Sequence, residues 1–95
     1  DTALTYAAFM GHAEVVALLI EKEVNVNASG LADWTALHLA AQRGHEKIVE
    51  QLIAKGAEIN ALTEEGFGGT PLDVADANLA ELLRKHGGKT ADALK

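Results

Sequence analysis

The chain has 95 residues, and Ala and Leu, with 18 and 13 copies, dominate its apolar residues, which favours close-packed helices over β-sheets. Its 14 acidic and eight basic side chains give a net charge of −6, which argues against a nucleic-acid partner, because such partners bind clustered cations. The absence of cysteine excludes disulfides, thiolate metal sites and thiol catalysis, and no apolar run approaches the roughly 20 residues of a membrane span.

The sequence repeats itself with a period of 33 residues. When residues 1–28 are aligned with residues 34–61, 13 of the 28 positions are identical. A period of this length indicates a supersecondary unit that buries its apolar face only by stacking on its neighbours. We therefore expect a single array over residues 1–95. Its parts are repeat 1 at about 1–28, repeat 2 at about 29–61, a C-terminal capping repeat at about 62–89 and a tail at 90–95.

The first unit begins inside the repeat and has more apolar residues than one buried side requires. Terminal units of such arrays need a polar outer face, so we expect the chain to be a fragment of a longer array that self-associates or frays over residues 1–20 when isolated. Glu23 stands where the middle unit has Gly56, and a left-handed turn at a glutamate would be strained by roughly 1 kcal/mol. The apolar residues of the first unit that exceed the needs of one buried side are drawn from Tyr6, Phe9, Met10, Val15, Val16, Leu18 and Leu19.

The middle unit predicts two short helices. Thr35 can cap the first helix, and the second follows Gly44-His45. Gly56 comes just after the last apolar residue, where a left-handed residue often ends a helix. One face of the second helix is apolar and the other is charged, as expected of a half-buried helix. The apolar face consists of Ile48, Val49, Leu52 and Ile53.

Two segments between the helices, 25–34 and 60–69, mix Gly, Asn, Asp and Thr without helical periodicity, so we expect extended loops or fingers. The last unit opens at Thr70-Pro71 and is shorter than the others. Thr90 can cap a final helical turn in the tail. A polar outer set predicts that the last unit is a cap, and its members are Asp76, Asn78, Glu81, Arg84, Lys85 and Lys89.

Together these features resemble the ankyrin repeat over about residues 1–90. The resemblance implies an all-α solenoid of stacked antiparallel helix pairs with extended finger loops, and a protein-binding scaffold. Asp33 stands where the family commonly has Gly, and Thr5 and Asp73 replace the His38 type, so polar contacts between units are expected to differ in detail. The matching motifs are the run TALHLAA from Thr35 to Ala41, Gly44-His45, Ile48-Val49, Gly56-Ala57, Asn60-Ala61 and Thr70-Pro71-Leu72.

The resemblance also implies where a partner binds, because ankyrin proteins typically use their finger tips and the exposed, concave side of the first helices. Tryptophan and arginine often contribute much of the binding energy of an interface. Trp34 and Phe67 could instead fold down and cover the core. The acidic balance favours a partner of basic character. The predicted site consists of Trp34, Leu31 and Asp33 in the first finger, Phe67 and Glu65 in the second, and Phe9, Met10, Gln42 and Arg43 in the helices.

No catalytic, cofactor or metal site is predicted. Ser29 is the only serine and has no base and acid near it in a recognisable triad arrangement. The histidines lack zinc spacing, and we expect His38 to bond backbone between units. Asn27 and Asn60 share one repeat position, so we expect them to brace the loops.

Two other functions remain open. The repeats can be a spacer or targeting module of a larger enzyme, or the chain can assemble with itself through the uncapped N-terminal repeat. The lack of cysteine and of a visible signal peptide favours the cytoplasm. We expect a protein partner, and neither a nucleic acid nor a membrane.

Overall fold

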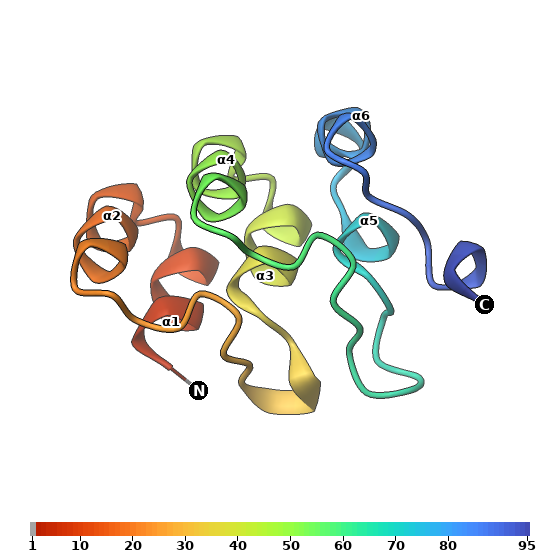
Figure 1. Ribbon diagram of the computed structural model, residues 1–95, viewed down its shortest axis with the longest axis horizontal. Helices are drawn as coiled ribbons and strands as arrows, with labels where there is room; N and C mark the ends of the chain where they lie inside the picture. Colours follow the sequence, from red (N-terminus) through yellow and green to blue (C-terminus); the bar gives the residue numbers. More distant parts are fainter. Residues whose placement is uncertain (1) are drawn as a thin grey trace.

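The computed structural model describes residues 2–95. Within these residues six α-helices form three helix pairs, and the only β-type pairing is an isolated bridge between Ser29 and Thr35. The pairs stand side by side in chain order (Figure 1). The helices are α1 (Ala3–Met10), α2 (Ala13–Glu21), α3 (Ala36–Arg43), α4 (Glu46–Ala54), α5 (Pro71–Val74) and α6 (Ala77–Lys85), and short 3₁₀ segments occur at Leu31–Asp33 and Asp92–Leu94.

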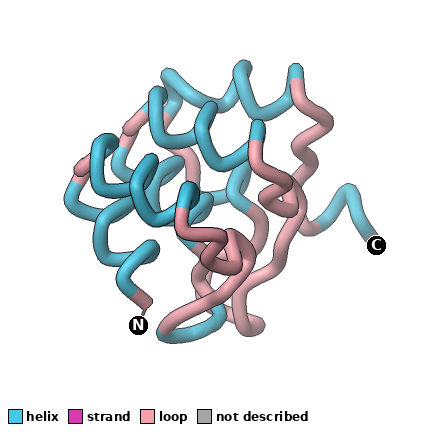
Figure 2. The backbone as a smooth tube through the Cα atoms, turned by 60° about the vertical axis from the view of Figure 1, so that its left-hand side comes forward, coloured by secondary structure: helices cyan, strands magenta, loops and turns pink. Residues whose placement is uncertain are grey.

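Two layers of helices and two fingers make up the fold. The first helices of the pairs, α1, α3 and α5, form one layer, and α2, α4 and α6 form the other (Figure 1). Segments 25–34 and 60–69, the first finger and the second finger, leave the helices on the same side (Figure 2). Stacking of the pairs makes the molecule longer than it is thick, with extents of 35 × 24 × 20 Å.

The first helix of every pair begins with the same reciprocal cap. A threonine hydroxyl accepts a hydrogen bond from the backbone of the third helical residue, whose side chain accepts one from the threonine backbone. Thr5 and Asp73 therefore replace the His38 type without loss of the cap. The capping pairs are Thr2 with Thr5, Thr35 with His38, and Thr70 with Asp73.

The turns after the second helices use left-handed backbone. Gly56 has φ +91°, which confirms the predicted left-handed stop. Glu23, at the equivalent position, also keeps a positive φ of +61°, so the first turn is not rebuilt around it. A glutamate in this conformation costs roughly 1 kcal/mol relative to glycine. The first turn therefore stores strain that the second does not.

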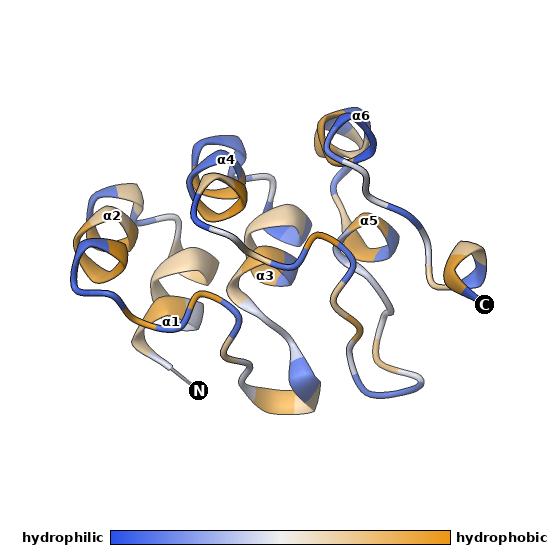
Figure 3. Cartoon of the chain, viewed as in Figure 1, coloured by the Kyte–Doolittle hydropathy of each residue, from blue (hydrophilic) through white to orange (hydrophobic). Residues whose placement is uncertain are grey.

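The core lies between the two helical layers. The alanines that α1 and α3 turn toward each other are completely or almost completely buried and let these helices approach closely, namely Ala7, Ala8, Ala36, Ala40 and Ala41. The side of α4 that faces α3 is apolar and its opposite side is hydrophilic, as predicted (Figure 3). Burying each large aliphatic side chain contributes about 1.5 to 3 kcal/mol. The large buried side chains of the second helices are Val16, Ile48, Val49, Leu52, Leu79 and Leu83.

Two asparagines tie each unit to the next. Asn27 Nδ2 donates to the carbonyl oxygen of Gly56 at 3.3 Å, and its Oδ1 accepts from the backbone N–H of Glu58 at 2.7 Å. Asn60 makes the equivalent pair of bonds one unit later, at 3.2 and 2.7 Å. The predicted bracing role is confirmed, and it links the loops that follow successive second helices.

The two ends of the array differ. In α2, Val15 and Leu18 are 45% and 53% exposed. Their equivalents in α4 are covered, because Ile48 is 1% exposed and Gln51 donates from Nε2 to the carbonyl oxygen of Ala13 at 3.2 Å. The first helix pair thus has an uncovered apolar edge, whereas the polar side chains predicted to cap the last unit are all exposed.

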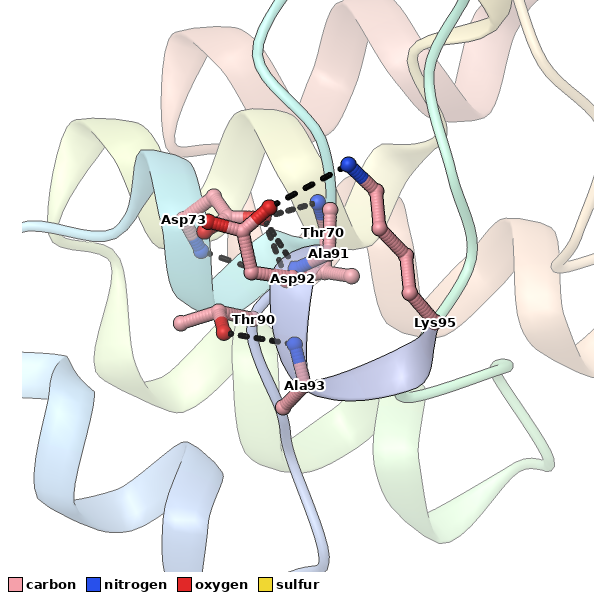
Figure 4. Close-up of polar contacts among 7 residues, drawn as sticks. All are labelled: Thr70, Asp73, Thr90, Ala91, Asp92, Ala93 and Lys95. Carbon is pink, nitrogen blue, oxygen red and sulfur yellow. Dashed lines mark hydrogen bonds and ion pairs between the residues drawn. The ribbon is translucent and has the colours of Figure 1, made fainter.

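The tail packs against the start of α5. Thr70 Oγ1 donates to the carbonyl oxygen of Lys89 at 2.6 Å. Asp73 Oδ2 accepts from the backbone N–H of Ala91 at 2.8 Å (Figure 4). Thr90 Oγ1 accepts from the backbone N–H of Ala93 at 3.2 Å, but the N-cap of the 3₁₀ segment is Ala91, so Thr90 does not cap it as predicted. Asp73 therefore holds the tail as well as capping its own helix.

Candidate interaction groove

An apolar groove of about 540 Å³ lies between the first helices and the fingers. One wall comes from α1 and α3, and the other comes from both fingers. It brings together five of the nine predicted site residues. The lining consists of Thr5, Tyr6 and Phe9 from α1, Leu39 and Gln42 from α3, Leu31, Ala32 and Trp34 from the first finger, and Phe67 from the second.

Besides the buried Thr5, two side chains of the helical wall were missed by sequence reasoning. Tyr6 is 63% exposed and lies one turn before Phe9, while Leu39 lies one turn before Gln42. Residues three apart on a helix share a face. Tyr6 and Leu39 are also equivalent in the 33-residue alignment. The helical spacing of the residues already selected was therefore a signal that could have identified both.

The fingers are joined at their tips. The indole Nε1 of Trp34 donates to the carbonyl oxygen of Phe67 at 2.8 Å, and the backbone N–H of Glu64 donates to the carbonyl oxygen of Ala32 at 2.8 Å. The Trp34 ring also lies against the His38 ring, with centroids 5.6 Å apart. Trp34 is half-buried and Phe67 is 56% exposed. Trp34 thus lies against the buried His38 while it lines the groove.

His38 ties α3 to the second finger. Its Nδ1 accepts from the backbone N–H of Thr35 at 3.1 Å, which makes Nε2 the protonated nitrogen that donates to the carbonyl oxygen of Gly69 at 2.9 Å. Burial lowers the pKa of His38 below its ordinary value of 6.5, although the backbone of Gly69 and Ala61 and the charge of Asp73 oppose this shift. The predicted backbone bond between units is confirmed.

The other four predicted residues surround the groove without lining it. The Cζ atom of Arg43 lies 4.8 Å from the centroid of the Phe9 ring, so its guanidinium stacks at the groove edge. Asp33 is exposed on the first finger and has φ +62°. Met10 is 46% exposed at the end of α1. Glu65 lines a second hollow of about 650 Å³, between the second finger and the tail.

Neither a metal-binding cluster nor a membrane-spanning helix occurs among the described residues. No group of three or more His, Asp or Glu side chains among residues 2–95 is arranged to hold a metal ion. No helix in this part of the chain has the length and apolarity needed to cross a bilayer.

Comparisons with known proteins agree with the fold. A family model described as ankyrin repeats (3 copies) matches residues 1–63 and 33–92. Among solved structures, the chain is similar to the human ASB11 ankyrin repeat domain, with 31% sequence identity and a TM-score of 0.85. The match covers 94% of this chain and 41% of the ASB11 chain, so this chain spans less than half of that length. No curated protein matches the sequence at a significant level. The similarity confirms the predicted all-α solenoid.

Proposed function

The chain belongs to the ankyrin repeat family, and we propose that it is a scaffold that binds a partner protein in the groove between its first helices and its fingers. Ankyrin repeats are generally protein–protein interaction modules. One observation carries the proposal: large apolar side chains gather in the groove and stay exposed. Tyr6, Phe67 and Leu31 are 63%, 56% and 83% exposed. Single exposed apolar residues are ordinary, but a hollow lined by several of them is typical of a binding surface.

The proposed mechanism is rigid presentation. The two hydrogen bonds between the fingers and the bond from His38 to Gly69 fix the finger wall relative to α3. A partner therefore docks on a surface that is already ordered, and little conformational entropy is lost on binding. Affinity should then depend on a few buried anchors.

We propose that these anchors come from the groove lining, with rim contacts from the remaining predicted residues. Tyr6 and Leu39 are added to the predicted set because they belong to the same wall. The net charge of −6 supports a partner of basic character, mainly through faster encounter. The proposed binding residues are Trp34, Phe67, Leu31, Phe9, Gln42, Tyr6 and Leu39, with Asp33, Arg43, Met10 and Glu65 at the rim.

The wider assignment follows from the family. The ankyrin fold generally serves as a non-catalytic scaffold, so we propose no reaction for this chain. We also propose that residues 1–89 form the three predicted units. The lack of cysteine supports a cytoplasmic location as a further proposal. The exposed edge at Val15 and Leu18 supports self-association as a second candidate function. Sedimentation over a range of concentrations tests it, and a mass that stays monomeric would contradict it.

Affinity capture with matched variants tests the groove. The double variant Tyr6→Ala/Phe67→Ala removes two exposed lining side chains. The control Leu18→Ala/Leu62→Ala removes two side chains that are 53% and 54% exposed outside the groove. We expect the wild type and the control to retain the same amount of a partner protein. The affinity of the groove variant should be lower by about tenfold or more, because a loss of about 1.4 kcal/mol in binding free energy is enough for a tenfold change. Equal retention by all three folded proteins would contradict the proposal.

A further inference from the structure

The rim of the groove carries opposite charges at its two ends. At the finger end, the exposed Asp33 lies between the lining residues Ala32 and Trp34. At the other end, Arg43 is the last residue of α3. The apolar lining lies between these ends.

These rim charges have no close counter-ion within the described chain. Among residues 2–95 the only ion pair within 4.0 Å joins Lys95 and Asp92. Asp76 packs beside Gly44 but caps α6, with Oδ1 accepting from the backbone N–H of Asn78 at 2.9 Å. Arg43 instead stacks on Phe9, which holds its guanidinium at the groove edge. The rim is therefore complementary to a ligand with opposite charges at its own two ends.

The length of α3 sets the spacing. Its eight residues, Ala36–Arg43, rise about 1.5 Å each, so α3 is about 12 Å long and carries Arg43 at the end opposite the first finger. An extended peptide advances about 3.3 Å per residue. About four residues of such a peptide would span the distance, with an apolar side chain over the lining between them.

We propose that the groove recognises an extended segment of the partner protein in which one bulky apolar side chain lies between a basic and an acidic residue about four positions apart. The basic residue faces Asp33, and the acidic residue faces Arg43. The inference rests on the proposed function, because it specifies the ligand of the same groove. The apolar anchor supplies affinity, and the charges set selectivity, since exposed ion pairs change binding by no more than about fivefold each.

A displayed library of random nine-residue peptides, selected on the immobilised 95-residue chain, tests this arrangement. On the wild type we expect enrichment of Trp, Phe or Leu flanked by Lys or Arg on one side and by Asp or Glu on the other. On Arg43→Glu the acidic residue should give way to a basic one. On Asp33→Asn, which tolerates the left-handed backbone, the basic preference should weaken by a fewfold. The control Lys47→Glu reverses an exposed charge outside the groove and should leave the wild-type pattern intact.

The outcomes separate the inference from the proposed function. Suppose that the selected peptides share an apolar residue and that this preference disappears on Tyr6→Ala/Phe67→Ala. If these peptides lack the flanking charges, or if the charges are unchanged on Arg43→Glu, the inference is overturned but the groove remains a binding site. Peptides enriched equally on wild type and on Tyr6→Ala/Phe67→Ala would contradict both. Dimerisation abolished by the same double variant would show that a second copy occupies the groove, and would also overturn the inference. Thermal melting of each variant checks that all of them fold.

Discussion

The indole nitrogen of Trp34 and the carbonyl oxygen of Phe67 are joined by a hydrogen bond of 2.8 Å between residues 33 positions apart. This bond uses the side chain of Trp34 but only the backbone of Phe67. Substitution of the two residues therefore separates the structural link between the fingers from the apolar surface that they offer.

Replacing Trp34 with phenylalanine should destabilise the fold while an aromatic ring remains in the groove wall. Trp34→Phe keeps a ring beside His38 and removes the indole donor, so we expect the free energy of unfolding to fall by about 1 kcal/mol. Amide exchange in the second finger should also accelerate. Phe67→Leu is the matched control, because it keeps the accepting carbonyl and should unfold at nearly the wild-type denaturant concentration. Equal stability of Trp34→Phe and wild type would show that this bond contributes nothing.

Stability should fall when the pH drops below about 6.5. The folded state lowers the pKa of His38 through burial, so below its ordinary value of 6.5 the unfolded chain binds this proton more readily. The stabilisation is complete above 6.5 and is lost as the pH falls toward the lower, folded pKa. Urea unfolding at a series of pH values should show this decline, and His38→Gln should remove most of it. An identical pH dependence in that variant would assign the effect to other groups.

A second loss of stability is expected only in stronger acid, from Asp73. Burial, the largest single influence, raises the pKa of this carboxyl, but hydrogen bonds from Thr70 and Ala91 together lower it below the ordinary 3.8. The stabilisation is present above 3.8 and is lost as the pH falls toward the folded pKa. Asp73→Asn should abolish this step and, near neutral pH, increase amide exchange at Ala91. Unchanged exchange there would contradict the role of Asp73 in holding the tail.

Substitutions at the two left-handed turns should change the free energy of unfolding in opposite directions. Glu23→Gly relieves strain and should raise the free energy of unfolding by up to about 1 kcal/mol, whereas Gly56→Ala should lower it by about the same amount. A Cβ at Gly56 would meet no atom within 4 Å, so the loss would come from the backbone rather than from a clash. Denaturant midpoints that move the same way in both variants would refute this account.

Removing either bracing asparagine should destabilise the array. Asn27→Ala and Asn60→Ala each delete two hydrogen bonds between units and should cost about 1 kcal/mol, because solvent replaces part of what is lost. Asn78→Ala is the control, since alanine favours the helix that contains it. Thermal unfolding of the three variants distinguishes them. An equal loss of stability in Asn78→Ala would mean that the hydrogen bonds of Asn27 and Asn60 between units contribute no more than an ordinary surface side chain.

Much of the fold could be predicted because its signals are local and repeated. Thr35, Gly56 and Asn60 perform their roles within one unit or at a fixed offset, so a single aligned copy indicates what they do. The groove depends on long-range contacts and was predicted less completely. Met10 follows Phe9 by one residue, about 100° around the helix, and therefore leaves the groove wall that Phe9 helps to form. The bond between Trp34 and Phe67 had no sequence signal, because it depends on how two irregular loops fold against each other.

The position of Trp34 has a practical consequence. It is the chain's single tryptophan, and its ring lies in the groove wall where the two fingers meet. Intrinsic fluorescence excited at the indole band therefore reports from this one place, without an attached dye. Docking of a ligand should displace water from the ring and shift the emission maximum toward the blue, so the molecule carries its own optical reporter of occupancy.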